Sequence, residues 1–187
     1  MYNFTEDEKK LLLKIARDAI LYGLKHNKEM QITLANLPDK FKHNAATFVT
    51  ITLNKELRGC IGSLFAHEAL ALDVAHNAFN AAFLDPRFAP LKTVEFSNIQ
   101  IEISILTVPH KINFTNESEL FAKINPGIDG LILTAGTYRA TFLPSVWEMI
   151  PDKKKFLQQL KLKAGLASNY WSDAIIVEKY QVEKISE

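Results

Sequence analysis

The chain contains only one cysteine, Cys60, among its 187 residues. A single cysteine excludes a disulfide within the chain, and it excludes a zinc or iron–sulfur centre built from several cysteines of this chain alone. The residues indicate no metal site, and they leave the identity of any cofactor open. A lone thiol without disulfides is typical of a reducing compartment, so we expect a cytoplasmic protein.

Excess charge of one sign and long apolar runs are also absent. The net charge is +1, which provides no bulk electrostatic attraction to nucleic acid or acidic lipid. No apolar run approaches the roughly 20 residues of a membrane span. Residues 1–6 lack the basic and apolar regions of a signal peptide. Membrane insertion is therefore not expected, and nucleic acid is the least favoured partner.

The remaining composition, 48% hydrophobic and 23% charged, is ordinary for one globular domain of this length, so residues 1–187 are read as a single domain. Hydrophobic spacing predicts the following elements: helices over 6–24 and 67–83, a hairpin of 47–53 with 57–64, a strand over 99–106, a hairpin of 131–134 with 137–143, a helix after Asp152, and a strand over 174–185. Hairpins imply antiparallel pairing. The predicted fold class is α+β, with an antiparallel or mixed sheet covered by helices.

Two polar stripes are predicted to face solvent. On the helix over 67–83, the side chains of Asp73, His76, Asn77 and Asn80 share one side. The late helix has five lysines, which are predicted to face outward: Lys153, Lys154, Lys155, Lys161 and Lys163. Such a row can also contact phosphates, but no stacking aromatic residues are interleaved with it.

Residues 57–64, Leu-Arg-Gly-Cys-Ile-Gly-Ser-Leu, carry the strongest chemical signal. Glycine in a strand marks close backbone approach, a bulge or a ligand. The binding candidates here are Gly59, Gly62 and Ser63. Side chains two apart on a strand share a face, so Arg58 is expected beside Cys60, where its guanidinium favours the thiolate. The alternative is a small, buried and inert cysteine.

Further candidates could move protons or hold an anion near this thiol. His67, at the entrance of the following helix, is a candidate base. Asp85 and Arg87 lie in a loop that a proline stiffens. In one reading they form an ion pair with each other at the surface. In the other, the Asp85 carboxylate accepts and the Arg87 guanidinium donates hydrogen bonds to a substrate or a thiolate. Glu102 lies on the less apolar face of its strand. It is an acid or base if that face lines a cleft, and an ordinary solvent-side residue otherwise.

Several stretches together resemble one family. They are residues 47–50, 57–64, 85–90 (Asp-Pro-Arg-Phe-Ala-Pro), 101–107, 130–133, 142–147 and 162–166. The chain is similar to the AMMECR domain family, called AmmeMemoRadiSam system protein A in prokaryotes, over nearly its whole length. The combination of the cysteine motif with the Asp-Pro-Arg-Phe loop is the feature that is most specific to this family.

The resemblance implies an α+β fold in two unequal lobes with a cleft between them. It also implies a genomic association with a Memo-like protein, related to non-haem iron dioxygenases, and with a radical SAM protein. The family's characteristic motif maps onto residues 57–62 as a candidate active or binding site, and its loop maps onto Asp85, Arg87 and Phe88. Many relatives have a second cysteine where this chain has Lys161, which argues against a mechanism that needs two cysteines here.

Two functions stay open at this point. The first is a cysteine-centred enzyme that acts on a small molecule or peptide together with the Memo-like and radical SAM partners, with Cys60 as nucleophile. The second is a non-catalytic binding or adaptor module whose cleft holds a partner segment or ligand. In the second case the residues of the cysteine motif have a packing role, and its glycines allow neighbouring strands to approach each other closely.

Overall fold

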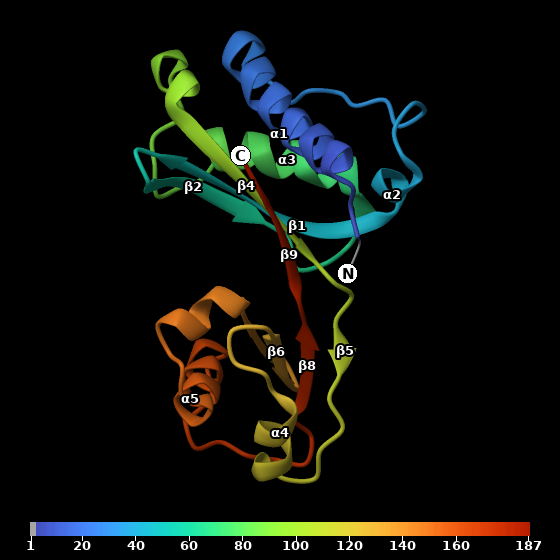
Figure 1. The fold of residues 1–187 in the computed structure, drawn as a ribbon. Coiled ribbons are helices and arrows are strands. Elements are labelled where there is room, and N and C mark those ends of the chain that lie inside the picture. The colour runs from blue at the N-terminus through green and yellow to red at the C-terminus, as the bar shows by residue number, and fades with distance from the viewer. Residues whose placement is uncertain (1–2) are drawn as a thin grey trace. The chain divides into compact units, whose positions relative to one another are not determined.

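The computed structural model describes residues 3–187 and divides into two compact units. The first unit extends to Thr107 and includes Glu183–Glu187, and the second is Val108–Val182. Each unit combines helices with an antiparallel sheet (Figure 1), which confirms the α+β prediction. The cleft expected between two lobes stays a prediction. Residues 1 and 2, part of the stretch assessed for a signal peptide, lie outside the described residues.

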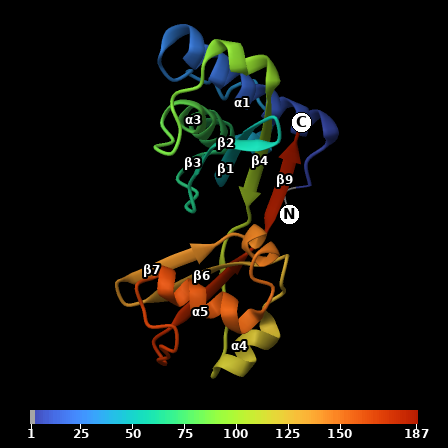
Figure 2. The same cartoon turned by 90° about the vertical axis from the view of Figure 1, so that its left-hand side faces the viewer.

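The first unit is a sheet covered on one face by two helices. The sheet has the order β2-β1-β4-β9, and β3 pairs with the start of β1. Its elements are α1 (Glu6–His26), α2 (Asp39–Lys42), β1 (Asn44–Leu53), β2 (Glu56–Gly62), β3 (Glu68–Ala69), α3 (Leu70–Phe83), the 3-10 helix η1 (Thr93–Asn98), β4 (Ile99–Leu106) and β9 (Val182–Ser186). In both views, α1 and α3 lie on the same side of the strands (Figures 1 and 2).

Local sequence signals explain the helix α1. The Thr5 hydroxyl accepts a hydrogen bond from the Glu8 backbone N–H, and the Glu8 carboxylate accepts one from the Thr5 backbone N–H, which forms a capping box. The helix ends at His26 and is capped by Asn27, whose φ of 53° lies in the left-handed region. None of the helices in residues 3–187 is both long and apolar enough to cross a membrane.

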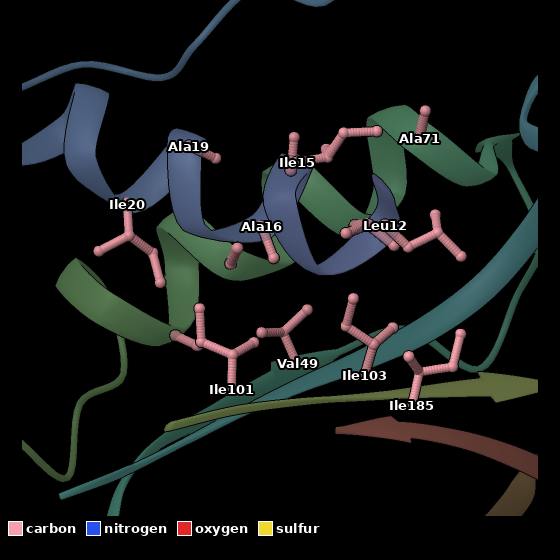
Figure 3. Packing of buried hydrophobic residues seen from close by; sticks show 14 of the residues in the cluster. Leu12, Ile15, Ala16, Ala19, Ile20, Val49, Ala71, Ile101, Ile103 and Ile185 are labelled. Atoms are coloured by element: carbon pink, nitrogen blue, oxygen red, sulfur yellow. The ribbon is translucent and has the colours of Figure 1, made fainter. Parts of the chain in front are cut away.

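The core of the first unit lies between α1, α3 and the sheet. Figure 3 shows Leu12 and Ala16 of α1 above Val49 of β1 and Ile103 of β4, all of them buried. Because side chains alternate across a strand, these apolar positions leave the residues between them on the opposite face of the sheet. That opposite face carries the candidate site described below.

The predicted solvent-facing stripe on α3 is wrong for two of its members. Asp73 and Asn77 are 1% and 5% exposed. The Asp73 carboxylate accepts hydrogen bonds from the backbone N–H and the hydroxyl of Thr47, at 2.8 and 2.6 Å, and from the Asn77 amide at 3.0 Å. Both residues are buried because they supply hydrogen-bonding partners to the strand β1, and this burial raises the pKa of Asp73.

The second unit has a sheet of order β5-β8-β6-β7 with its own core. Its elements are β5 (His110–Lys111), α4 (Glu117–Lys123), β6 (Gly130–Ala135), β7 (Tyr138–Phe142), the 3-10 helix η2 (Pro144–Glu148), α5 (Lys153–Lys163) and β8 (Ile176–Tyr180). The hairpin β6–β7 and the Asp152 cap of α5 confirm the sequence predictions. The predicted last strand is in fact two strands, β8 and β9, which belong to different sheets.

The prediction that Lys161 faces outward is also wrong. The Lys161 side chain is only 2% exposed, and its Nζ lies 2.9 Å from Oε1 of Glu117 on α4 and 5.4 Å from the ring centroid of Trp171. The long aliphatic stem of a lysine can pack in an apolar core while its charge reaches a partner. Glu117 is that partner, so Lys161 joins α5 to α4.

Candidate functional site

Three polar side chains form a row across the face of the first sheet that points away from α1 and α3. The register pairs Thr50 of β1 with Cys60 of β2 on one side and with Glu102 of β4 on the other. Directly opposite residues in an antiparallel sheet have Cβ atoms about 4.5–5.5 Å apart. Lys184 of β9 extends the row, with its Nζ 3.3 Å from Glu102 Oε1. We call Cys60, Thr50, Glu102 and Lys184 the thiol row.

The sulfur atom of Cys60 has polar neighbours and is partly exposed. The Thr50 hydroxyl donates a hydrogen bond to the sulfur at an O–S distance of 3.3 Å. The Arg87 guanidinium is the positive group beside the thiol. Its pKa is raised chiefly by hydrogen bonding to Asp85, and the Cys60 thiol adds a smaller contribution in the same direction. The sulfur is therefore not enclosed by hydrocarbon.

A pocket of about 280 Å³ opens on the same face. Its wall includes Thr50, Thr52, Gln100 and Glu102, together with Ser186 from β9. This volume lies just below the roughly 300–1,000 Å³ typical of small-molecule sites. The thiol row thus borders a space with hydroxyl, amide and carboxylate groups, which suits a small polar ligand or one peptide side chain.

Asp85 and Arg87 contact Cys60 mainly through its backbone. The Cys60 N–H donates to Asp85 Oδ2 at 2.9 Å, and Arg87 Nη2 donates to the Cys60 carbonyl at 3.1 Å. The two side chains also pair with each other, with Nη2 and Oδ2 2.7 Å apart. Because β2 is an edge strand, its outward backbone groups need partners. The loop therefore closes the sheet edge at the cysteine.

The hydrogen bonds from Arg87, and then those from two backbone N–H groups, hold the pKa of Asp85 well below its usual range. A carboxylate that remains ionised so firmly is a poor proton acceptor near neutral pH, because the best general base has a pKa near the working pH. The structure therefore supports a positioning role for Asp85 in preference to a role as a base.

Arg58 lies in a different setting from the one that strand alternation predicts. The register shifts between Ile51 and Thr52, so Arg58 is the extra residue of a β-bulge. Its guanidinium pairs with Glu95 through two hydrogen bonds of 2.8 and 3.1 Å. The Arg58 and Arg87 guanidinium carbons lie 6.0 and 5.5 Å from the Phe88 ring centroid. Arg58 and Phe88 thus brace the loop, and Glu95 balances the Arg58 charge.

Close backbone packing explains why glycine occupies positions 59 and 62 of the motif. A Cβ atom at Gly59 would lie 2.0 Å from the backbone oxygen of Ala81 on α3, and one at Gly62 would lie 2.3 Å from the backbone oxygen of Thr47. Both positions therefore admit only glycine without a backbone shift. Ser63 forms a turn, in which its hydroxyl accepts from the Phe65 N–H and donates to the Phe65 carbonyl.

His67 is placed with a carboxylate and not with the thiol. Its Nδ1 lies 2.8 Å from the Phe65 carbonyl oxygen, and its Nε2 lies 3.7 Å from Glu68 Oε1. Among the contacts of residues 3–187, none joins His67 to Cys60. Of the predicted proton carriers, Glu102 is the one that shares a sheet face and a row with the sulfur. Sequence reasoning missed Thr50 and Lys184, the other two members of the thiol row.

The structure therefore describes an α+β protein in which a loop at the sheet edge holds a strand that carries a cysteine. The chain belongs to the AMMECR1 family, since the sequence model of that family matches residues 13–185.

Individual relatives agree with this membership. Protein NEQ441 of Nanoarchaeum equitans is 38% identical over 168 residues, which cover 87% of this chain and 90% of the relative. A protein of Sulfurisphaera tokodaii is 41% identical over 181 residues, with coverages of 92% and 79%. In structure, the chain is similar to uncharacterized protein PH0010 from Pyrococcus horikoshii, with a TM-score of 0.86, 32% identity and coverages of 98% and 93%. None of these three names states a reaction.

Proposed function

We propose that this chain is a thiol-centred enzyme that acts on a small molecule or a peptide at the thiol row. One observation carries the proposal: a partly exposed sulfur accepts a hydrogen bond from Thr50, and Thr50 and its neighbour Glu102 line a pocket of about 280 Å³. A thiolate is the reactive form of cysteine, and hydrogen-bond donors and cations stabilise it. Thr50 and Arg87 supply these two kinds of neighbour.

In this proposal the sulfur attacks an electrophilic carbon of the substrate. The S–C bond forms from an electron pair of the thiolate, and the pair displaced from the carbon moves to its carbonyl oxygen or leaving group. The Glu102 carboxylate, positioned by Lys184, first accepts the proton that the Cys60 thiol loses and then delivers it to that oxygen or leaving group. The polar wall of the pocket orients the substrate through hydrogen bonds.

The proposal extends to partners and location. The lone cysteine supports a location in the reducing cytoplasm, and the family resemblance supports joint work with a Memo-like protein and a radical SAM protein. A peptide segment of such a partner, or the small molecule that these proteins share, is the proposed substrate.

A second candidate function is a binding or adaptor module. It is favoured by the observation that much of the motif has a packing role: Gly59 and Gly62 admit close backbone contacts, and Asp85 with Arg87 satisfies the edge of β2. For such a module, Cys60→Ser would leave the binding of a partner intact.

Acylation by a generic activated ester separates these functions. With p-nitrophenyl acetate, we expect one acetyl group per folded chain, located on Cys60 by mass spectrometry and absent in Cys60→Ser. Glu102→Gln should slow the turnover that follows, whereas Thr93→Val, at an exposed position of η1 outside both the pocket and the thiol row, should not. A folded protein that shows no acetylation at Cys60 would leave only the binding module.

A further inference from the structure

A second group of ligand-type side chains lies elsewhere in the first unit and shares no residue with the thiol row. One donor atom each from His67, Glu68 and Asp73 lies within 4.8 Å of the other two. Glu68 is held on the short strand β3, where it pairs with Ala45 of β1, and Asp73 lies in the first turn of α3. Regular structure therefore fixes the backbone of Glu68 and Asp73, and His67 lies in the loop directly before β3.

The ring of His67 is oriented so that one nitrogen is free to act as a ligand. Its Nδ1 lies 2.8 Å from the Phe65 carbonyl oxygen, and a carbonyl can only accept, so Nδ1 carries the proton. In the neutral ring, Nε2 then keeps its lone pair and points to Glu68 Oε1 at 3.7 Å. A backbone carbonyl on the other ring nitrogen is the usual partner of a metal-bound histidine.

Asp73 presents a buried carboxylate with one oxygen to spare. The side chain is 1% exposed, and its three hydrogen bonds, from the N–H and hydroxyl of Thr47 and the amide of Asn77, all end on Oδ2. Among residues 3–187, no group donates a hydrogen bond to Oδ1. Ligating carboxylates are commonly fixed in this way by hydrogen bonds to their second oxygen.

Glu68 connects the group to a cavity. It lines a pocket of about 220 Å³ together with His76, whose Nδ1 is also 3.7 Å from Glu68 Oε1. An ion or a water molecule can therefore reach Glu68 from the pocket, and Glu68 Oε1 has a second imidazole nitrogen nearby.

We propose that His67, Glu68 and Asp73 bind a divalent transition-metal ion, with Zn²⁺ as the best match. One imidazole nitrogen and two carboxylate oxygens form a mixed N/O donor set that suits Zn²⁺. Bonds of about 2.0–2.2 Å in a tetrahedral site place donors about 3.3–3.6 Å apart. The distance of 3.7 Å between His67 Nε2 and Glu68 Oε1 lies close to this range. Water or His76 fills the fourth position from the pocket.

Titration with metal tests the proposal. Co²⁺, followed by its visible absorption, and Zn²⁺, followed by calorimetry, are added to the tag-free full chain carrying Cys60→Ser, which removes the thiol as a competing ligand. We expect saturation at one equivalent and a Zn²⁺-dependent rise in the thermal unfolding midpoint. His67→Gln and Glu68→Gln should each weaken binding by about tenfold or more. His110→Gln, at an exposed histidine of the second unit, is the matched control and should bind normally.

The outcomes are decisive in either direction. Because Asp73 also supports β1, Asp73→Asn is included only if its thermal unfolding shows a folded protein. The His67 and Glu68 variants, which alter more exposed side chains, carry the test without it. If no saturable metal binding is observed, the proposal is wrong, and His67 and Glu68 form only an ion pair with each other. Unchanged affinity in both variants, or an equal loss in His110→Gln, would also overturn the proposal.

Discussion

At the scale of single residues, polar side chains decide how the cysteine strand is held. Asp85 illustrates this, because a small loop carboxylate satisfies the backbone N–H of Cys60 while Arg87 neutralises its charge. The pattern Asp-Pro-Arg in a sequence indicates a stiff loop but not the strand edge that it will meet. The contact with the thiol strand becomes visible only in the fold.

The lowered pKa of Asp85 leads to a prediction about acid stability. A carboxyl group whose pKa is lower in the folded than in the unfolded chain stabilises the fold above its unfolded pKa, about 3.9 for aspartate, and loses this contribution as the pH falls towards its folded pKa. In Asp85→Asn, the free energy of unfolding should therefore change less between about pH 5 and pH 2 than in the unaltered protein. Urea unfolding at a series of pH values measures this, with Asp173→Asn as an exposed control. Equal pH dependence in all three proteins would contradict the assignment.

The sequence predicts the environment of a residue correctly where neighbouring residues determine it. It does not do so where contacts with distant parts of the chain determine whether the residue is buried. The Thr5–Glu8 capping box follows from four adjacent residues and is confirmed. Helical spacing predicts solvent exposure for Asp73 and Lys161, because both positions lie on the polar faces of their helices. Tertiary partners, Thr47 for Asp73 and Glu117 for Lys161, made burial of these polar groups possible.

At the scale of elements, the hairpin β1–β2 determines which side chains form the site. The two-residue turn at Asn54 and Lys55 pairs Leu53 with Glu56. A regular ladder from that turn would pair Thr50 with Gly59. The bulge at Arg58 shifts the register by one, so Thr50 meets Cys60 instead. The sequence predicts the hairpin, but it does not mark the bulge, which is why Thr50 was missed.

The close approach of α3 to β2 is a second element-scale feature, and it predicts the cost of one methyl group. In Gly59→Ala, the new Cβ would meet the Ala81 backbone oxygen at 2.0 Å, so strand and helix must separate. We expect a loss of about 3 kcal/mol or more in the free energy of unfolding, at the upper end of overpacking effects.

A comparison variant separates the clash from other effects of replacing glycine. Gly127→Ala adds the same methyl group where no atom lies within 4 Å, at a φ of +78°. It should cost only the strain of a left-handed residue, about 1–2 kcal/mol. Urea unfolding of both variants measures the difference. A Gly59→Ala protein no less stable than Gly127→Ala would show that α3 and β2 do not approach as closely as described.

At the scale of the whole molecule, the sequence predicts the α+β class because hairpins and helices follow from local patterns. It does not predict two separate sheets. The apolar alternation over 174–185 is continuous enough to be read as one strand, yet β8 and β9 pair with different partners. β9 completes the first sheet next to β4 and brings Lys184 to Glu102, so the last residues of the chain contribute to the thiol row.

The central claim is that the folded chain keeps the sulfur of Cys60 accessible and activated. The most direct measurement is the rate of iodoacetamide alkylation near neutral pH, in the folded protein and in the urea-unfolded chain. We predict that the folded protein reacts at least as fast, that Thr50→Val slows the reaction severalfold, and that Thr52→Val does not. Slower alkylation in the folded protein, with Thr50→Val and Thr52→Val indistinguishable, would contradict the claim.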